Sequence, residues 1–252
     1  MKSLKALTLM GALIIAMGST SFAKDKDDDK ESDQVKRIDA SATVLDEIMG
    51  APDKGIPQEL LESAKCVAVV PSMVKAGFIV GARYGKGVAT CRTAAGWSAP
   101  APFTIAGGSW GLQIGGAAVD VVMLVMNDKG MERLLSSKFK LGAEASAAAG
   151  PVGRQSEANT DWKMRAEVLT YSRARGVFAG LELSGAVVKQ DDDDTHILYG
   201  KEVAFQDILR GKVSPPAGSQ HFMATVRKYA AEAKQERGAV EPATSPNTDS
   251  TR

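Results

Sequence analysis

The sequence is poor in the residues on which most catalytic and metal sites depend. Its 252 residues include only two cysteines and two histidines, and these four are not grouped at the spacing of zinc ligands. No serine is placed in a strand–turn–helix nucleophile elbow that could partner His196 or His221, so a hydrolase triad has no candidate. These absences predict a protein that is not an enzyme and that needs neither a metal nor a cofactor.

An excess of charge of one sign is also lacking. The 31 lysines and arginines nearly balance the 30 aspartates and glutamates, which gives a formal net charge of +1. This balance favours neither nucleic acid nor a membrane surface as a partner, and we expect no nucleic-acid binding. Any electrostatic site must therefore come from local clustering of charged side chains.

The first apolar run has the pattern of an export signal. Lys2 and Lys5 precede an apolar segment at 7–17, and Ser21-Phe22-Ala23 supplies small residues before a cleavage site after Ala23. The run is shorter than the roughly 20 residues of a spanning helix, and an uncleaved anchor is the alternative. The pattern predicts a signal peptide at 1–23. The protein is then exported, to the periplasm or the outer membrane or outside a bacterial cell.

The two cysteines, Cys66 and Cys91, each lie in an apparent strand. In an oxidising compartment the leading interpretation is a disulfide between them, and two buried free thiols are the alternative.

Composition divides the mature chain into three parts. Residues 24–34 are highly charged and predict a disordered leader, whereas 236–252 are rich in Pro, Ser and Thr and predict a disordered tail. We expect a single folded domain at 35–235, because 44% of the sequence is apolar and this length suits one β-rich domain.

Glycine is abundant where the apolar runs are. Between Cys66 and Val188 lie 17 of the 25 glycines, and many of them interrupt β-branched segments. Glycine in such a place marks a bulge, a bend or the close approach of another backbone. The pattern predicts an α+β protein with a bent, mostly antiparallel sheet or barrel-like core.

Several segments have the patterns of strands or helices. Strands are predicted at 64–71, 76–85, 85–93, 117–127, 166–176 and 177–190, and a proline-containing edge or bent strand at 98–106. Residues 142–154 favour a strand that ends in a turn because of the flanking glycines, and a helix suggested by the alanine content is the alternative. Helices are predicted at 57–64, 129–137, 203–211 and 219–235, and an amphipathic N-terminal helix at 35–49. Residues 191–200 are expected to form an acidic loop.

Three features could indicate a binding or catalytic site, but a structural role explains each of them better. The paired glycines of GARYGKG and GGSWGLQIGG match neither dinucleotide nor P-loop spacing. The run Asp191–Asp194 lacks the spaced ligands of a calcium loop. Asp120 is the one acidic residue in a long apolar run, and we expect an arginine or backbone amides to satisfy it; a general acid or base is the alternative.

Basic side chains cluster locally despite the neutral total. Arginines on turns between glycines can present guanidinium groups to phosphate, which suits anionic headgroups; solvated faces and ion pairs are the alternative. The candidate headgroup contacts are Lys75, Arg83, Lys86, Arg92, Arg154, Arg173 and Arg175. Trp97, Phe103 and Trp110 could supply an apolar wall, although burial in the core is the default for each.

Several phrases, taken in order, resemble one family. They are AKCVAVVPSMVKAGFIVGARYGKGV, GWSAPAPF, GLQIGGAAVDVVMLVMN, AAGPVGR, YSRARGVFAGLELSGA and LYG. On these phrases the chain resembles the SYLF domain family, also called the Ysc84 actin-binding domain, over about residues 40–210.

The resemblance implies a non-enzymatic lipid-binding module. In eukaryotic relatives a basic surface and an amphipathic N-terminal helix are linked to phosphoinositide-rich membranes, and the fungal ones are also linked to actin. The helix at 35–49 departs from this, because its basic residues are only Lys36 and Arg37. An exported bacterial protein would meet actin only if delivered to a host, so anionic phospholipid or another envelope lipid is the expected ligand. A protein partner in the envelope, without a lipid, is the alternative.

Overall fold

The computed structural model describes residues 22–51, 55–77, 80–110, 115–152, 166–174 and 177–240. The helices are α1 (Phe22–Met49), α2 (Gln58–Ser63), α3 (Asp128–Leu135), α5 (Asp192–Tyr199), α6 (Phe205–Leu209) and α7 (Gln220–Val240). The strands are β1 (Cys66–Gly77), β2 (Val80–Thr93), β3 (Gly96–Trp97), β4 (Ala101–Trp110), β5 (Gly115–Val125), β6 (Lys138–Lys140), β7 (Ala147–Ala149), β8 (Val168–Ala174), β9 (Val177–Gly180) and β10 (Val187–Gln190). Within the described ranges, no helix combines the length and the apolar content needed to cross a membrane.

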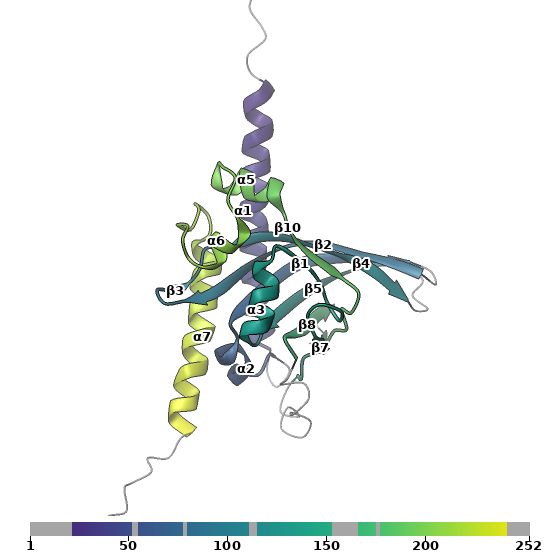
Figure 1. Ribbon diagram of the computed structural model, residues 1–252, viewed down its shortest axis with the longest axis vertical. Coiled ribbons are helices and arrows are strands. Elements are labelled where there is room, and N and C mark those ends of the chain that lie inside the picture. Colours follow the sequence, from purple (N-terminus) through teal and green to yellow (C-terminus); the bar gives the residue numbers. More distant parts are fainter. Residues whose placement is uncertain are drawn as a thin grey trace, which may run out of the picture.

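The strands form one curled sheet, which confirms the predicted α+β class with a bent, mostly antiparallel sheet. The order is β6-β10-β4-β2-β1-β5-β8-β7, with β3 beside β2 and β9 beside β8. The described pairs are antiparallel except β7 with β8. The centre of the sheet is the long pair β1 and β2, flanked by β5 and β4 (Figure 1).

Both faces of the sheet are covered in its middle. Side chains alternate along β1, so that Ala68 and Val70 join one apolar core and Val67 and Val69 join the other. Helices α3 and α6 pack within the curl, on the inner face, whereas α1, α2 and α7 cover the opposite, helix-covered face (Figure 1). Burial on both sides explains why residues 66–70 form a continuous apolar run.

β1 and β2 form one continuous hairpin, where the sequence predicted an interruption at Pro71 and another strand boundary at Gly85. Strand pairing passes both positions, with a register shift between Val70 and Met73. The shift is a β-bulge in which Ser72 has a left-handed φ of 55°. Because a bulge tolerates a residue without a ladder N–H, the proline does not end the strand.

β4 lies inside the sheet, so of the two predictions for 98–106, an edge or a bent strand, the edge position was wrong. The strand pairs with β2 on one side and with β10 on the other. Pro102 lies one residue beyond the last β10 pair, which joins Gln190 to Phe103. The proline therefore removes no donor from the β4–β10 ladder, and the strand can be central.

Asp192–Tyr199 form the helix α5, with Asp191 and Gly200 as its caps, so the prediction of an acidic loop at 191–200 was also wrong. The side chain of Asp191 accepts a hydrogen bond from the backbone N–H of Asp194, and Gly200 ends α5 with a φ of 68°. The acidic first turn lies at the positive end of the helix dipole, where carboxylates are stabilising. The aspartates thus begin a helix.

The two terminal helices are longer than the sequence predicted. Residues 24–34, the expected disordered leader, belong to α1, and 236–240, the start of the expected tail, belong to α7. Oppositely charged side chains three apart support α1, as in the Lys36–Asp33 ion pair of 3.3 Å. The predicted signal peptide lies almost entirely outside the described residues and stays a prediction.

Candidate functional site

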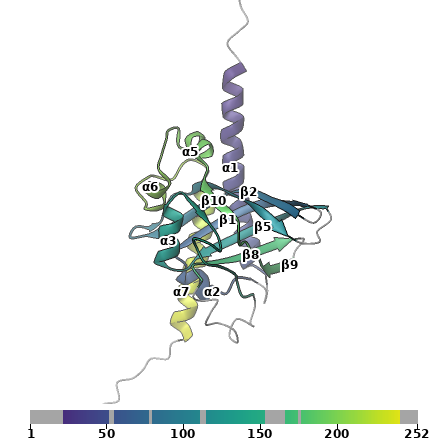
Figure 2. The ribbon, with the colours of Figure 1, turned by 45° about the vertical axis from the view of Figure 1, so that its right-hand side comes forward.

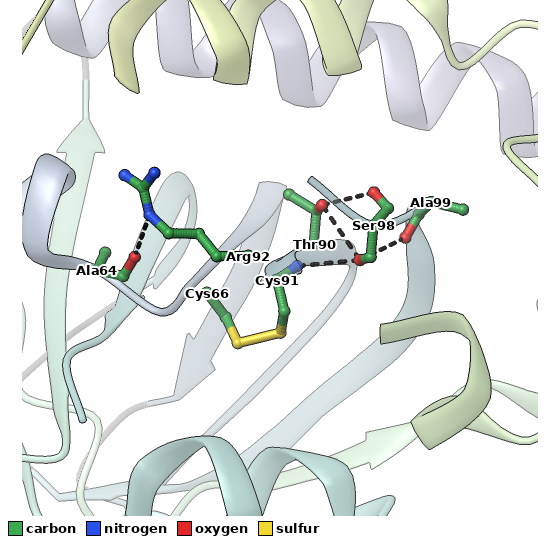
Figure 3. Close-up of a disulfide and its surroundings, with 7 residues drawn as sticks. All are labelled: Ala64, Cys66, Thr90, Cys91, Arg92, Ser98 and Ala99. Atoms are coloured by element: carbon green, nitrogen blue, oxygen red, sulfur yellow. Dashed lines mark hydrogen bonds between the residues drawn. A yellow bond between two sulfur atoms is a disulfide. The ribbon is translucent and has the colours of Figure 1, made fainter. Parts of the chain in front are cut away.

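A disulfide joins Cys66 to Cys91 across the central hairpin (Figure 3). The two residues are direct partners in the β1–β2 pairing, and both are fully buried. Ser98 lies beside them and donates from its hydroxyl to the carbonyl of Ala99, while its oxygen accepts from the Cys91 N–H at 3.0 Å (Figure 3). The sulfur atoms belong to the core and are not presented to a ligand.

The five described cations of the predicted headgroup site do not form one basic surface. Some lie on the inner face of the sheet and others on the helix-covered face, and they are spread along the strands. The five are Lys75, Arg83, Lys86, Arg92 and Arg173. Arg154 and Arg175 lie outside the described residues.

Arg92 holds the end of α2. Its guanidinium donates to the carbonyls of Ala64 at 2.9 Å and Glu62 at 2.9 Å, and it lies over the ring of Trp97, 4.5 Å from the centroid. Burial lowers the pKa of Arg92. Carbonyls at a helix C-terminus need such donors, so Arg92, a predicted headgroup contact, has a structural role here. Trp97, a candidate for an apolar wall, packs against the Arg92 guanidinium.

Lys86 belongs to a buried ion-pair cluster on the helix-covered face. Its ammonium lies 2.7 Å from a carboxylate oxygen of Asp191 and 3.0 Å from one of Asp194. The Asp194 carboxylate also accepts hydrogen bonds from Gln34, at 2.9 Å, and from Arg37. The cluster joins α1, β2 and α5, and it neutralises Lys86, which is therefore not available to a headgroup.

The cluster makes stability depend on pH. Burial raises the pKa of Asp191, but hydrogen bonds from Lys86 and from the Asp194 N–H, with the charge of Lys86, outweigh burial and hold it below its usual value. Such a carboxyl stabilises the fold above its unfolded pKa of about 3.9, and this contribution is lost as the pH falls through the lower, folded pKa. We expect the free energy of unfolding, measured in urea from pH 5 to pH 2, to fall more steeply for the wild type than for Asp191→Asn. Equal slopes would contradict this assignment.

Arg173 and Asp120 satisfy one another. The Arg173 guanidinium donates to one Asp120 oxygen at 2.8 and 3.0 Å and also pairs with Glu47 of α1. The other Asp120 oxygen accepts the backbone N–H of Ser72 in the β-bulge, at 2.9 Å. The structural explanation of Asp120, an arginine with a backbone amide, is confirmed, and Arg173 is neutralised.

Lys75 and Arg83 are adjacent cations on the inner face, directly opposite one another in the β1–β2 register. In the part of the chain that the structure describes, neither forms an ion pair. Arg83 donates to the carbonyls of Gly108, at 2.9 Å, and Glu182, at 3.0 Å, which fixes its guanidinium. Burial and then the charge of Arg83 lower the pKa of Lys75. Two like charges this close repel, and a bound anion would relieve them.

The remaining candidates lie in the sheet. Phe103 is fully buried in the inner-face core, as the default predicted, and the side chain of Trp110 is outside those described. Gly107-Gly108-Ser109-Trp110-Gly111 has the literal spacing of a nucleophile elbow, but Ser109 lies within β4, and the next described element is the strand β5. Among the described residues, no three metal-binding side chains come together.

Comparison with known proteins identifies the fold's family. Residues 106–229 match the family model described as Ysc84, Las17-binding protein actin regulator. This protein belongs to the Ysc84 family. The predicted SYLF resemblance is thereby confirmed. The segment that matches the Ysc84 model runs from within β4 to within α7. The β1–β2 hairpin, which contains Lys75 and Arg83, precedes this segment.

The curated relatives are longer Ysc84-like proteins. The rat SH3 domain-containing YSC84-like protein 1 is 35% identical over 180 residues, which are 71% of this chain and 53% of the relative. The human protein of the same name is 36% identical over 171 residues, 67% of this chain and 50% of the relative. LAS seventeen-binding protein 3 of Saccharomyces cerevisiae is 31% identical over 190 residues, 74% of this chain and 41% of the relative. The chain thus spans about half the length of the curated relatives it matches, or less.

Proposed function

We propose that this protein is a non-enzymatic lipid-binding protein of the bacterial envelope. It recognises anionic phospholipid or phosphoinositide-like headgroups through the pair Lys75 and Arg83. The observation that carries the proposal is that neither of these two adjacent cations forms an ion pair with a described carboxylate, whereas Lys86 and Arg173 do. The charge of Glu182 acts on Arg83 without forming an ion pair with it. Arginine with a fixed guanidinium and a neighbouring lysine is well suited to a phosphate group.

Two further observations support the proposal. Asp120, the alternative general acid or base, is held by Arg173 and the Ser72 N–H, so it has a structural task. The Cys66–Cys91 disulfide suits an oxidising compartment, and the signal sequence predicted at 1–23 would deliver the chain there. Export to the periplasm, the outer membrane or the exterior is part of the proposal.

Sedimentation with vesicles tests the lipid-binding proposal. The double variant Lys75→Gln/Arg83→Gln is expected to bind phosphatidylcholine vesicles containing phosphatidylglycerol about thirtyfold more weakly, because each cation near an anionic surface contributes about 1 kcal/mol. The matched control is Lys138→Gln/Lys140→Gln, which removes the same charge from exposed positions of β6 and should bind like the wild type. Binding by the wild type should weaken as salt is added.

Two results would contradict the proposal. One is equal binding to neutral and anionic vesicles. The other is an unchanged affinity of the Lys75→Gln/Arg83→Gln variant, provided that its thermal unfolding shows it to be folded.

The name of the yeast relative records a protein partner, LAS seventeen, which favours a protein-interaction module as the second candidate. A wild-type protein that binds no vesicle would favour that candidate.

A further inference from the structure

The centre of the sheet extends beyond its helices as a four-stranded projection. We call it the arm and define it as residues 74–77 of β1, 80–84 of β2, 106–110 of β4 and 115–119 of β5. Figures 1 and 2 show the ends of these strands passing the helices and pointing away from them. The helices that cover the middle of the sheet therefore leave the arm uncovered.

One face of the arm is exposed and has no charge. On the face that α1 and α7 cover elsewhere, the described side chains of the arm are all exposed and are all apolar or glycine, apart from one tyrosine hydroxyl. They are Val74, Ala76, Ala82, Tyr84, Ala106, Gly108, Gly116 and Ala118. Val74 and Tyr84 are direct partners and are 51% and 50% exposed. A contiguous apolar patch of this kind marks a surface for a membrane or a partner.

The patch ends at ion pairs. On β2 the next side chain of the same face after Tyr84 is Lys86, which Asp191 and Asp194 neutralise. On β5 the next one after Ala118 is Asp120, which Arg173 neutralises. The charges at the border of the patch are therefore compensated within the protein.

The opposite face of the arm is cationic. Lys75 and Arg83 project there, one residue along from Val74 and Tyr84, because successive side chains of a strand alternate. The arm thus has an apolar side and a side with two positive charges, neither of which forms an ion pair with a described carboxylate; only the charge of Glu182 acts on Arg83. An anionic bilayer complements both sides, whereas a second copy packed on the apolar side would bring no anion to Lys75 and Arg83.

We propose that the uncharged face of the arm rests on the acyl chains of an anionic bilayer while Lys75 and Arg83 reach the lipid phosphates. This inference rests on the proposed function and adds the orientation and the depth of binding. The polar region of a leaflet is roughly 5–7 Å thick, and a single sheet layer with long lysine and arginine side chains can span it. The ligand is then a lipid within a bilayer, and a soluble headgroup cannot replace it.

The first test removes apolar surface and keeps the charge. Val74→Thr/Tyr84→Ser is expected to bind phosphatidylcholine–phosphatidylglycerol vesicles about tenfold more weakly. Burying exposed apolar surface of this size in a bilayer should strengthen binding by about a factor of ten. Its dependence on salt should equal that of the wild type. Val177→Thr is the matched control, because Val177 is 67% exposed and lies outside the arm.

The second test measures depth. A polarity-sensitive fluorophore on Tyr84→Cys should shift to the blue on vesicle binding and be quenched by brominated acyl chains. The same fluorophore on Ser63→Cys, an exposed position of α2, should do neither. Cys66 and Cys91 do not compete for the label because they are buried and bonded to each other.

The outcomes separate the inference from the proposed function. If Val74→Thr/Tyr84→Ser binds like the wild type while Lys75→Gln/Arg83→Gln loses affinity, headgroup recognition stands and the membrane-resting arm is wrong. If the apolar variant changes only self-association, measured by sedimentation velocity, the patch belongs to a second copy and the inference fails. If neither double variant changes vesicle binding, both proposals fail.

Discussion

Replacing Gly87 with alanine is expected to destabilise the fold by about 3 kcal/mol, because the new methyl group has no room. A Cβ atom at this position would lie 2.2 Å from the carbonyl oxygen of Val69 and 3.0 Å from the ring of Phe103. The first neighbour is backbone of the adjacent strand and cannot rotate away. Phe103 is the direct partner of Gly87 across the β2–β4 pair, so its ring packs where a side chain would be.

Equilibrium unfolding in urea measures the effect of Gly87→Ala through the midpoint at unchanged slope. Gly116→Ala is the control, since the nearest described atom to its Cβ would be the Lys75 carbonyl oxygen, at an ordinary contact distance of 3.9 Å. That variant should unfold within about 0.5 kcal/mol of the wild type. A Gly87→Ala protein with the wild-type midpoint would show that β1 does not approach Gly87 closely enough to exclude a methyl group.

Asp194→Ala is expected to cost about 2–3 kcal/mol. The substitution removes the carboxylate that binds Lys86, Arg37 and Gln34, so half-buried Arg37 loses the Asp194 carboxylate and Lys86 is left with Asp191 alone. Breaking a buried ion pair in this way costs about 3–5 kcal/mol, and the partial exposure of the cations places this case at the lower end.

The control for Asp194→Ala is Asp193→Ala, which removes the same charge from the same helical turn. Asp193 is exposed, so its replacement should change the free energy of unfolding by less than about 0.5 kcal/mol. Proteolysis gives a second measurement, because loss of the cluster should expose the α1 segment that begins at Gln34. If the two variants were equally stable, the ion-pair cluster would not contribute to holding α1 against the rest of the protein.

Local signals predicted the elements that depend on local chemistry. The helix predicted at 129–137 is confirmed at α3, where the side chain of Asn127 caps the helix by accepting a hydrogen bond from the N–H of Gly130. Interactions from distant parts of the chain decided the others. β4 is central because β10 pairs with it, and the predicted strand at 177–190 is divided because β9 pairs with β8 and β10 with β4.

The candidate site was only partly predictable for a geometric reason. Arg83 and Lys86 are close in sequence, but an odd separation along a strand puts them on opposite faces. The sequence does not reveal that Lys75 faces Arg83, because this register depends on the bulge at Ser72. A shift of one residue would turn Lys75 to the other face. The exposed apolar face of the arm was missed for a similar reason, since alanine and glycine have the same pattern in a core and on a surface.

The two terminal helices have a consequence for when the protein can fold. Leu45 of α1 and Phe222 of α7 belong to the same core, on the helix-covered face. A growing chain makes α1 long before α7, so this core cannot close until the chain has been synthesised beyond Phe222. The arrangement therefore delays folding. Delayed folding is required of a chain that is exported from the cytoplasm in an unfolded state.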